Sequence, residues 1–149
     1  MTTHTALIVD DEPDIRDLLE ITLSRMGIAT LTAENVASAK QQLADNPPQL
    51  CLTDMNLPDG NGIDFIRDLR EAVPECLCIV ITIHDDDRHV FPALRAGARG
   101  YLLKQQSQSE LARRLAGIID DEPPLSPSVA RRVLATFAPP DTIAQPYLT

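Results

Sequence analysis

The stretch that decides the fold is LCLTDMNLPDGNG, residues 50–62. It begins with a short, largely apolar run before turn-forming residues, which is typical of a buried strand in a parallel sheet. Asp54 stands where this strand should end, and the turn residues 58–62 lead into a helical pattern over residues 63–72. The carboxyl ends of parallel strands face the crevice in which open α/β sheets bind ligands. Asp54 is therefore a candidate site residue, although a turn or capping role is the commoner fate of such an Asp.

The rest of the chain repeats this alternation of a short strand and a helix. Strands are predicted over residues 6–9, 28–33, 50–53, 77–83 and 101–103, and a helical pattern follows each of them. Five such units predict an α/β fold with a parallel sheet and helices on both faces. Right-handed crossovers favour a flavodoxin-like (βα)5 doubly wound sheet of strand order 2-1-3-4-5, with an extra C-terminal helix. Periodicity alone would not distinguish this sheet from a barrel fragment.

Helix boundaries are marked by the usual residue types. Pro13 stands in the first turn of the first helix, where its missing N–H costs nothing, and Gly27 ends that helix. Asn35 is a predicted N-cap of the second helix, and Ser107 or Ser109 of the fifth. These residues support the predicted order of strands and helices.

Composition limits the functions that the chain can have. Its 149 residues suffice for one domain with a real core. The net charge is −9 and the only lysines are Lys40 and Lys104, so these residues are poorly suited to grip nucleic acid themselves. No stretch has the length of a membrane span, and the first residues lack a signal-peptide pattern. We expect a cytoplasmic protein without membrane contact.

Three cysteines, Cys51, Cys76 and Cys78, could suggest metal or redox chemistry. Cys76 and Cys78 open an apolar run, and no His or Cys set with zinc spacing accompanies them. We interpret all three as small buried apolar side chains.

Polar residues follow the other predicted strands as well. Asp10 and Asp11 end the first strand, Thr82 lies at the end of the fourth and Lys104 follows the fifth. Because parallel strands end at one edge, we expect these residues to gather around Asp54. Converging carboxylates repel one another unless a cation joins them, and Mg²⁺ suits oxygen ligands beside a phosphate. Singly, each residue could be an ordinary cap, strand or surface residue. Together they predict a site in which Asp54 is a nucleophile that forms an acyl phosphate, while Lys104 and Thr82 orient the phosphoryl oxygens.

This constellation resembles the receiver (CheY-like) domain of two-component response regulators, over about residues 5–120. The segments that carry the resemblance are Ile8-Val9-Asp10-Asp11-Glu12-Pro13, Thr53-Asp54-Met55-Asn56-Leu57-Pro58-Asp59-Gly60, Thr82, and Ala98-Arg99-Gly100-Tyr101-Leu102-Leu103-Lys104. We therefore assign residues 1–120 to a receiver domain.

The resemblance implies specific roles. Asp54 would accept a phosphoryl group from a histidine kinase or a His phosphotransfer domain. The Mg²⁺ ligands would be Asp10, Asp11, Asp54 and the backbone carbonyl of Asn56, with Mn²⁺ as a substitute. Thr82 and Tyr101 look like the pair that switches the surface of the fourth helix, fifth strand and fifth helix. The protein would not be an enzyme beyond its own phosphorylation and dephosphorylation.

Residues 121–149 are predicted to form a C-terminal helix and a Pro-rich linker. The run from Leu125 to Ala130 resembles the helix that follows the receiver in LuxR/NarL-type transcription factors, with Ser126 as N-cap and Pro127 as first helical residue. The apolar stripe of this helix consists of Val129, Val133, Leu134 and Phe137. The stripe could pack against its own domain, bind a second copy in a phosphorylation-dependent homodimer, or contact a DNA-binding domain absent from this chain.

Ile83 and Pro92 are among the positions that depart from the family pattern. Ile83 is bulky where a small residue is usual and could slow entry of the phosphodonor. Pro92 should kink or shorten the fourth helix. His84 lies beside the predicted pocket, where we expect a rim residue rather than one that tunes dephosphorylation.

Two alternatives to a transcription-factor receiver follow from the same residues. A stand-alone receiver would act by docking or in a phosphorelay. An aspartyl-nucleophile phosphatase would need an Asp as general acid where this chain has Asn56, so that alternative is disfavoured.

Overall fold

The computed structural model describes residues 4–120 and 124–137. Its centre is a parallel sheet of five strands in the order β2-β1-β3-β6-β7. This is the predicted order 2-1-3-4-5, because two short strands fall between the third and fourth strands of the sheet. The flavodoxin-like prediction is therefore confirmed. The sheet strands are β1 (Thr5–Val9), β2 (Ala29–Ala33), β3 (Leu50–Thr53), β6 (Leu77–Thr82) and β7 (Gly100–Leu103).

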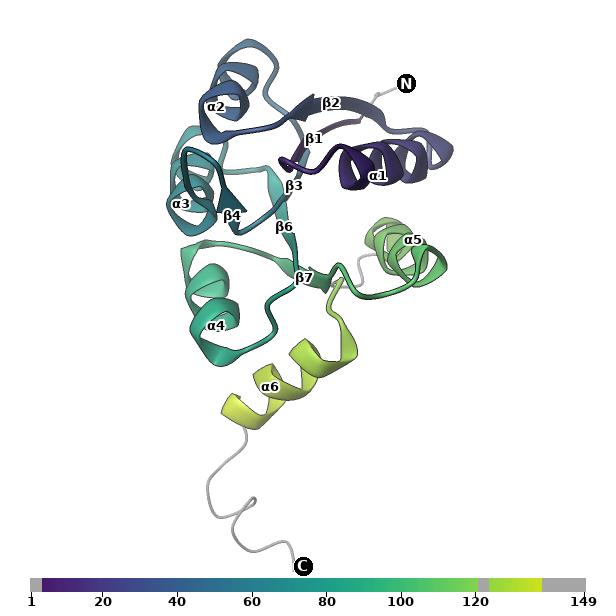
Figure 1. Ribbon diagram of the computed structural model, residues 1–149, viewed down its shortest axis with the longest axis vertical. Helices are drawn as coiled ribbons and strands as arrows, with labels where there is room; N and C mark the ends of the chain where they lie inside the picture. Colours follow the sequence, from purple (N-terminus) through teal and green to yellow (C-terminus); the bar gives the residue numbers. More distant parts are fainter. Residues whose placement is uncertain (1–3, 121–123, 138–149) are drawn as a thin grey trace, which may run out of the picture.

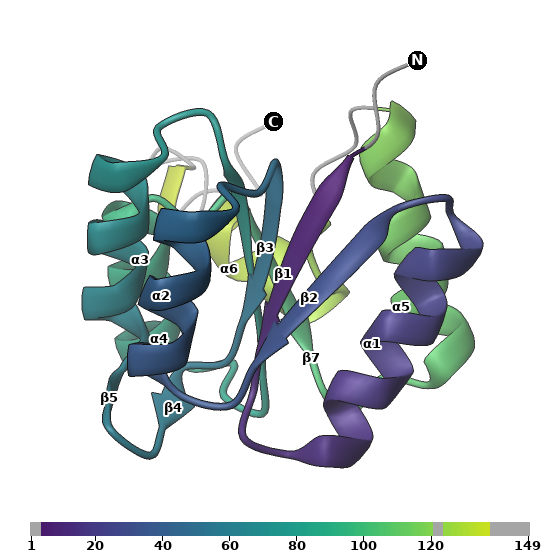
Figure 2. The same cartoon turned by 90° about the horizontal axis from the view of Figure 1, so that it is seen from above.

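Helices cover both faces of the sheet (Figures 1 and 2). α2, α3 and α4 lie on one face, α1 and α5 on the other, and α6 lies beside α4 at the β7 end of the sheet. A 3₁₀ turn, Gly117–Asp120, follows α5. The helices are α1 (Pro13–Arg25), α2 (Val36–Asp45), α3 (Gly62–Ala72), α4 (Asp87–Ala96), α5 (Gln108–Ala116) and α6 (Pro127–Phe137).

The strands are buried on both faces because alternate side chains point to opposite helix layers. Leu7 and Val9 of β1 pack in the cluster under α2, α3 and α4. Ala6 and Ile8 of the same strand pack against α1 and α5. This arrangement explains why the strands read as uninterrupted apolar runs.

The local signals gave mostly correct helix boundaries. The side chain of Asn35 accepts a hydrogen bond from the Ser38 amide at 2.8 Å, and Ser107, rather than Ser109, caps α5. Gly27 follows α1 with a φ of 81°, a conformation that glycine adopts at little cost. Pro92 lies inside α4, and the helix continues to Ala96 beyond it.

A short hairpin, β4 (Asn56–Leu57) and β5 (Gly60–Asn61), occupies the stretch that we predicted as a turn. Its tip carries Asp59, whose carboxylate accepts hydrogen bonds from the amides of Val36 and Ala37 at 2.7 and 3.0 Å. These bonds at the start of α2 lower the pKa of Asp59. The hairpin is thereby fixed to α2, next to the segment that carries Asp54.

The segment before α6 extends the sheet beyond β7. The Tyr101 amide donates to the Pro124 carbonyl at 2.8 Å, and the Ser126 amide donates to the Tyr101 carbonyl at 3.0 Å. Gly100 permits this approach, because a Cβ there would lie 2.5 Å from Cγ of Pro124. The chain after α5 therefore returns to the sheet edge instead of leaving the domain.

Pro127 is the first residue of α6 and Ser126 directly precedes it, as predicted, but the predicted role of the Ser126 side chain needs correction. The Ser126 hydroxyl does not cap the helix: it accepts from the Leu103 amide at 3.0 Å and donates to Oε1 of Gln106 at 2.7 Å, because both partners face it from β7 and its loop. Of the predicted stripe, Val129 is buried and Leu134 is 70% exposed, so the fold of this chain covers only part of it, and the three predicted partners of the stripe stay predictions. The Phe137 side chain and the predicted linker lie outside the described residues.

Among the described residues, no helix has the length and apolar character needed to cross a membrane. The three cysteines are free thiols, with Cys51 and Cys78 buried opposite each other on β3 and β6 and Cys76 half-buried. Burial raises the pKa of Cys76 to about 12, so this thiol stays protonated at neutral pH. The cysteines thus lie in the core region, as predicted.

Replacing Ser126 by Ala should destabilise the domain by about 1–3 kcal/mol, because the Leu103 amide would be left without its buried partner. Urea unfolding measures the change. Ser128→Ala is the matched control, since Ser128 also lies at the start of the helix and has no side-chain hydrogen bond among the described residues. Equal stability of the two variants would show that the Ser126 contacts contribute nothing.

Candidate functional site

The predicted site residues meet where the strands end. Asp10 follows β1, Asp54 follows β3 and Lys104 follows β7. The ammonium group of Lys104 lies 2.9 Å from Oδ2 of Asp10 and 3.1 Å from Oδ2 of Asp54. It also contacts Oε1 of Glu12 at 2.9 Å. Three carboxylates from two strand ends thus share one cation.

The central ion pairs of this group are buried. The side chains of Asp10, Asp54 and Lys104 are only 3%, 9% and 8% exposed. Burial raises the pKa of Asp10, although the Glu12 amide and Lys104 oppose this effect. Burial alone would lower the pKa of Lys104, but the hydrogen bonds to Glu12 and Asp10 and the charges of Asp10 and Asp54 outweigh it and raise the pKa. The lysine is therefore charged at neutral pH.

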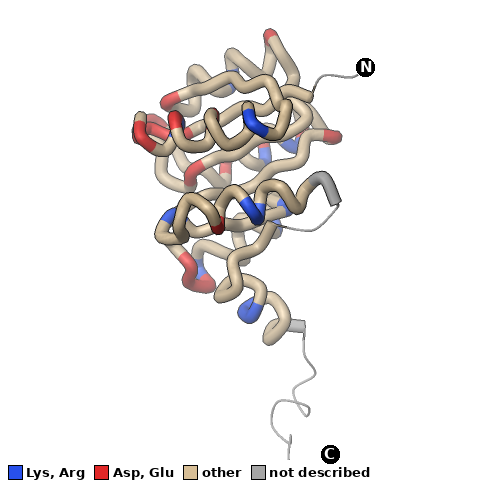
Figure 3. The backbone as a smooth tube through the Cα atoms, turned by 90° about the vertical axis from the view of Figure 1, so that its right-hand side faces the viewer, with Lys and Arg blue, Asp and Glu red and all other residues tan. Residues whose placement is uncertain are grey.

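The acidic residues exceed the charge that one lysine can balance. Asp10, Asp11, Glu12 and Asp54 each bring a carboxylate oxygen within 4.8 Å of the others. Asp11 and Glu12 are exposed, so the group is open to solvent on one side. Figure 3 shows acidic segments gathered on the left of the molecule, while basic segments are spread more evenly. An all-oxygen set with excess negative charge fits a hard divalent cation.

The backbone after Asp54 is held tightly. The Met55 amide donates to Oδ1 of Asp54 at 2.7 Å, and the Gly62 amide donates to the Met55 carbonyl at 2.7 Å. A Cβ on Gly62 would lie 2.5 Å from the Asp54 carbonyl oxygen, so only glycine fits there. Asn56 follows on β4, with its side-chain amide 2.9 Å from Nε2 of His84.

The residues predicted as a switch pair converge on the backbone of His84. Thr82 is fully buried at the end of β6, and its hydroxyl accepts from the His84 amide at 3.4 Å. The Tyr101 ring is fully buried, and its hydroxyl donates to the His84 carbonyl at 2.5 Å. Burial, with nearby Asp86, Asp85 and Asp54, raises the pKa of Tyr101. The ring therefore lies inside the fold rather than on its surface.

Sequence reasoning predicted that Asp10, Asp54 and Lys104 meet, as they do in the structure, but it missed three contacts around them. Glu12 reaches Lys104, and the Arg16 guanidinium donates to the Asp10 carbonyl at 2.7 Å. Glu12 is the N-cap of α1 and Arg16 lies four residues later, and this spacing at the start of the helix could have indicated both. The role of the His84 backbone carries no sequence signal. Ile83 is 56% exposed, and its predicted effect on donor entry stays a prediction.

Replacing Lys104 by Met should destabilise the domain by about 3–5 kcal/mol at neutral pH, because two buried carboxylates would lose their cation. The pKa of Asp10, already raised, should rise further. A carboxyl group whose pKa is higher in the folded state than in the unfolded state lowers the free energy of unfolding as pH rises. The deficit should therefore be smallest near the ordinary pKa of 3.8 and grow toward neutral pH, as measured by urea unfolding.

Lys40→Met is the control, since Lys40 forms an ion pair with Asp68 in which both side chains are about half exposed. Its cost should stay below about 1 kcal/mol. A Lys104 variant with the same small, pH-independent cost would contradict the importance of the buried ion pairs.

Comparison with known proteins agrees with this geometry. The sequence model of the response regulator receiver domain family matches residues 6–116 of the chain. The response regulator protein PilR of Pseudomonas aeruginosa is 48% identical over 104 residues, which cover 70% of this chain and 23% of PilR. The KDP operon transcriptional regulatory protein KdpE of Escherichia coli is 40% identical over 111 residues, covering 73% of this chain and 48% of KdpE. The chain spans less than half the length of these relatives.

Solved structures show the same fold. A LuxR-family response regulator from Aurantimonas sp. SI85-9A1 matches with a TM-score of 0.78 and 24% identity, over 91% of this chain and 98% of that one. The chemotaxis response regulator CheY4 of Vibrio cholerae matches with a TM-score of 0.72 and 23% identity, over 78% and 99% of the two chains. With the family match over most of its length, the chain belongs to the receiver domain family of two-component response regulators.

Proposed function

We propose that this receiver accepts a phosphoryl group on Asp54 and transmits the change through Thr82 and Tyr101. The observation that carries the proposal is the Lys104 ammonium held between Asp54 and Asp10, beside an acidic group that fits a divalent cation. Nucleophile, fixed positive charge and cation ligands are the parts that phosphoryl transfer requires.

In the proposed reaction, a carboxylate oxygen of Asp54 attacks the phosphorus of a phosphohistidine on a kinase or phosphotransfer domain. A P–O bond forms, the P–N bond breaks, and the leaving ring nitrogen takes a proton from solvent, so that the donor becomes a neutral imidazole. Asp10, Asp11, Asp54 and the Asn56 carbonyl would hold Mg²⁺, which neutralises phosphoryl charge when bound. Lys104 would turn its ammonium from the Asp54 carboxylate to a phosphoryl oxygen.

The proposed output follows the contacts of Tyr101. Its hydroxyl bonds to the His84 carbonyl, and its backbone pairs with the segment before α6. A movement of Thr82 toward the phosphoryl group would pull on the His84 amide and thereby on the Tyr101 hydroxyl. The predicted switch surface, formed by α4, β7 and α5, would then change its packing. Arg132 of α6 forms an ion pair with Asp87 of α4 at 2.6 Å, so a movement of α4 would also affect α6.

The proposed biological role is control of transcription in the cytoplasm. Several similar proteins are named transcriptional regulators, among them KdpE and the DNA-binding transcriptional activator DevR/DosR of Mycobacterium tuberculosis, 36% identical over 86 residues. DNA contact would come from another domain of the LuxR type, with a phosphorylation-dependent homodimer as one output form. Asn56, whose side-chain amide contacts His84, offers no general acid, so turnover of an external phosphate ester is not proposed.

Incubation with Mg²⁺ and acetyl phosphate should add one phosphoryl group, measured as intact mass. The Asp54→Asn variant should gain none, and chelation of the metal should abolish the gain in the wild type, because the carboxylate is the proposed nucleophile and the metal neutralises the charge. Asp59→Asn is the matched control, since Asp59 lies in the same loop but bonds to α2.

The Ile83→Ala variant tests whether the bulky side chain blocks the phosphodonor. A gain in the Ile83→Ala variant alone would mean that Ile83 obstructs the small donor. No gain in either protein, with acetyl phosphate or a phosphorylated kinase, would contradict the proposal.

Mg²⁺ should also stabilise the folded chain in the absence of any phosphodonor. A ligand at one hundred times its dissociation constant contributes about 2.7 kcal/mol, which thermal or urea unfolding detects. Asp11→Asn should remove most of this gain because it deletes an exposed ligand. Asp14→Asn should retain it, since Asp14 is equally exposed but lies outside the acidic group. An equal response of both variants would place the ion elsewhere.

A further inference from the structure

The turn between β7 and α5 contacts three separate parts of the molecule through consecutive side chains. The Lys104 ammonium is held by the carboxylates of the acidic site. Nε2 of Gln105 donates to the Ile83 carbonyl at 3.0 Å. Oε1 of Gln106 accepts from the Ser126 hydroxyl at 2.7 Å. Three neighbouring residues thus join the acidic site, the β6–α4 loop and the segment before α6.

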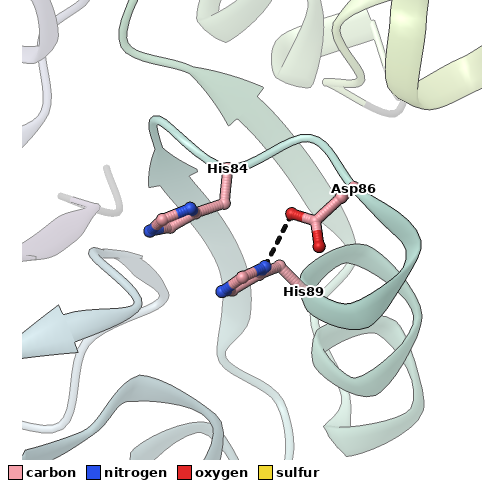
Figure 4. A group of neighbouring side chains, drawn as sticks. All are labelled: His84, Asp86 and His89. Atoms are coloured by element: carbon pink, nitrogen blue, oxygen red, sulfur yellow. Dashed lines mark hydrogen bonds and ion pairs between the residues drawn. The ribbon is translucent and has the colours of Figure 1, made fainter.

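The contact of Gln105 is the weakest of the three. Gln105 is exposed, so water competes with its side chain for the carbonyl oxygen. The loop that it reaches also has side-chain contacts of its own. Figure 4 shows the ring of His84 stacked on that of His89 in α4, with centroids 4.0 Å apart, and Nδ1 of His89 lies 2.7 Å from Oδ1 of Asp86. The connection of the turn to more distant parts of the molecule therefore depends mainly on Gln106.

Ser126 holds the turn from the edge of the sheet. This residue is only 1% exposed, and its hydroxyl accepts from the Leu103 amide at 3.0 Å while it donates to Gln106. The amide of the next residue, Lys104, donates to the Thr82 carbonyl of β6 at 2.8 Å. The backbone that carries the lysine is therefore fixed on two sides, by β6 and by Ser126.

The position of the ammonium group matters for phosphoryl transfer. In the proposed function, on which this inference rests, Lys104 turns from the Asp54 carboxylate to a phosphoryl oxygen. A positive charge held in place stabilises the developing charge best, because it need not be reoriented during the reaction. The Gln106 amide also closes the turn by donating to the Leu103 carbonyl, but at 3.2 Å this bond is at the long end of the usual range. The contact with Ser126 therefore contributes to the orientation of the lysine.

We propose that Gln106 and Ser126 are positioning residues for Lys104, so that the segment before α6 takes part in phosphoryl transfer although it lies outside the acidic site. The contact also acts in the other direction, because a movement of Lys104 toward a phosphoryl oxygen pulls on the turn that Ser126 holds. The bonds of the Ser126 hydroxyl would then loosen. This route from the acidic site to α6 does not pass through the Tyr101 side chain.

The test is the rate at which acetyl phosphate phosphorylates the chain in saturating Mg²⁺, a reaction in which the Asp54 carboxylate displaces acetate from phosphorus. Gln106→Met removes the acceptor but keeps the length of the side chain. It should slow the reaction at least about fivefold, since misplacing a catalytic group by about 1 Å costs about 100-fold. Gln106→Glu keeps an acceptor for the Ser126 hydroxyl and should react nearly as fast as the wild type. Gln108→Met is the control, because Gln108 is exposed at the start of α5 and has no side-chain hydrogen bond among the described residues.

Two further measurements separate positioning from a loss of structure. The affinity for Mg²⁺ without phosphodonor should hardly differ among these proteins, because Gln106 acts on the lysine and does not contact the acidic group. Circular dichroism should show that all of them are folded. In the wild type, phosphorylation should speed the hydrogen exchange of the Leu103 amide, measured by NMR, because its bond to Ser126 loosens.

The proposal is wrong if Gln106→Met reacts as fast as the wild type, or if Gln106→Glu is slowed as much as Gln106→Met. It is also wrong if phosphorylation leaves the exchange of the Leu103 amide unchanged. A wild type that accepts no phosphoryl group would contradict the proposed function and this inference together. A wild type that is phosphorylated normally, with Gln106 variants that match it, would contradict this inference alone.

Discussion

The contact on which the site depends is one buried ammonium shared among carboxylates. Lys104 joins residues that follow β1 and β3 to the end of β7, so it connects the centre of the sheet to its edge. Buried carboxylates at such short range would repel each other without it. The same charge that stabilises the resting site is the charge that a phosphoryl oxygen would need. Stability and the proposed chemistry therefore draw on the same group, and a change that improves one affects the other.

The larger plan of the molecule could be predicted because it depends on local patterns. Buried parallel strands are short apolar runs, helices show 3.6-residue spacing, and the ends of parallel strands necessarily meet. These rules were enough to bring Asp10, Asp54, Thr82 and Lys104 to one edge. What escaped prediction depends on partners distant in sequence or on elements too short to show a period. Glu12 meets Lys104 across 92 positions, Ser126 meets Leu103 across 23, and each strand of the β4–β5 hairpin has two residues.

His84 connects several parts of the molecule that would otherwise be separate. Its amide contacts Thr82, its carbonyl contacts Tyr101, and its ring lies between Asn56 and His89. Backbone and side chain thus serve different neighbours, and a substitution tests only the ring. The interpretation of His84 as a plain rim residue is incomplete. Its backbone contacts could not be predicted, because the sequence does not indicate in which direction a backbone carbonyl points.

The segment before α6 also covers the edge of the sheet at β7. An unpaired edge strand offers a row of N–H and C=O groups to any extended chain that approaches it. Here the amide and carbonyl of Tyr101 are already occupied by Pro124 and Ser126, and the buried Val129 anchors the helix that follows. A domain cut after residue 120 would uncover this edge together with an apolar patch. Its solubility and self-association would then reflect the position of the cut rather than the behaviour of the receiver.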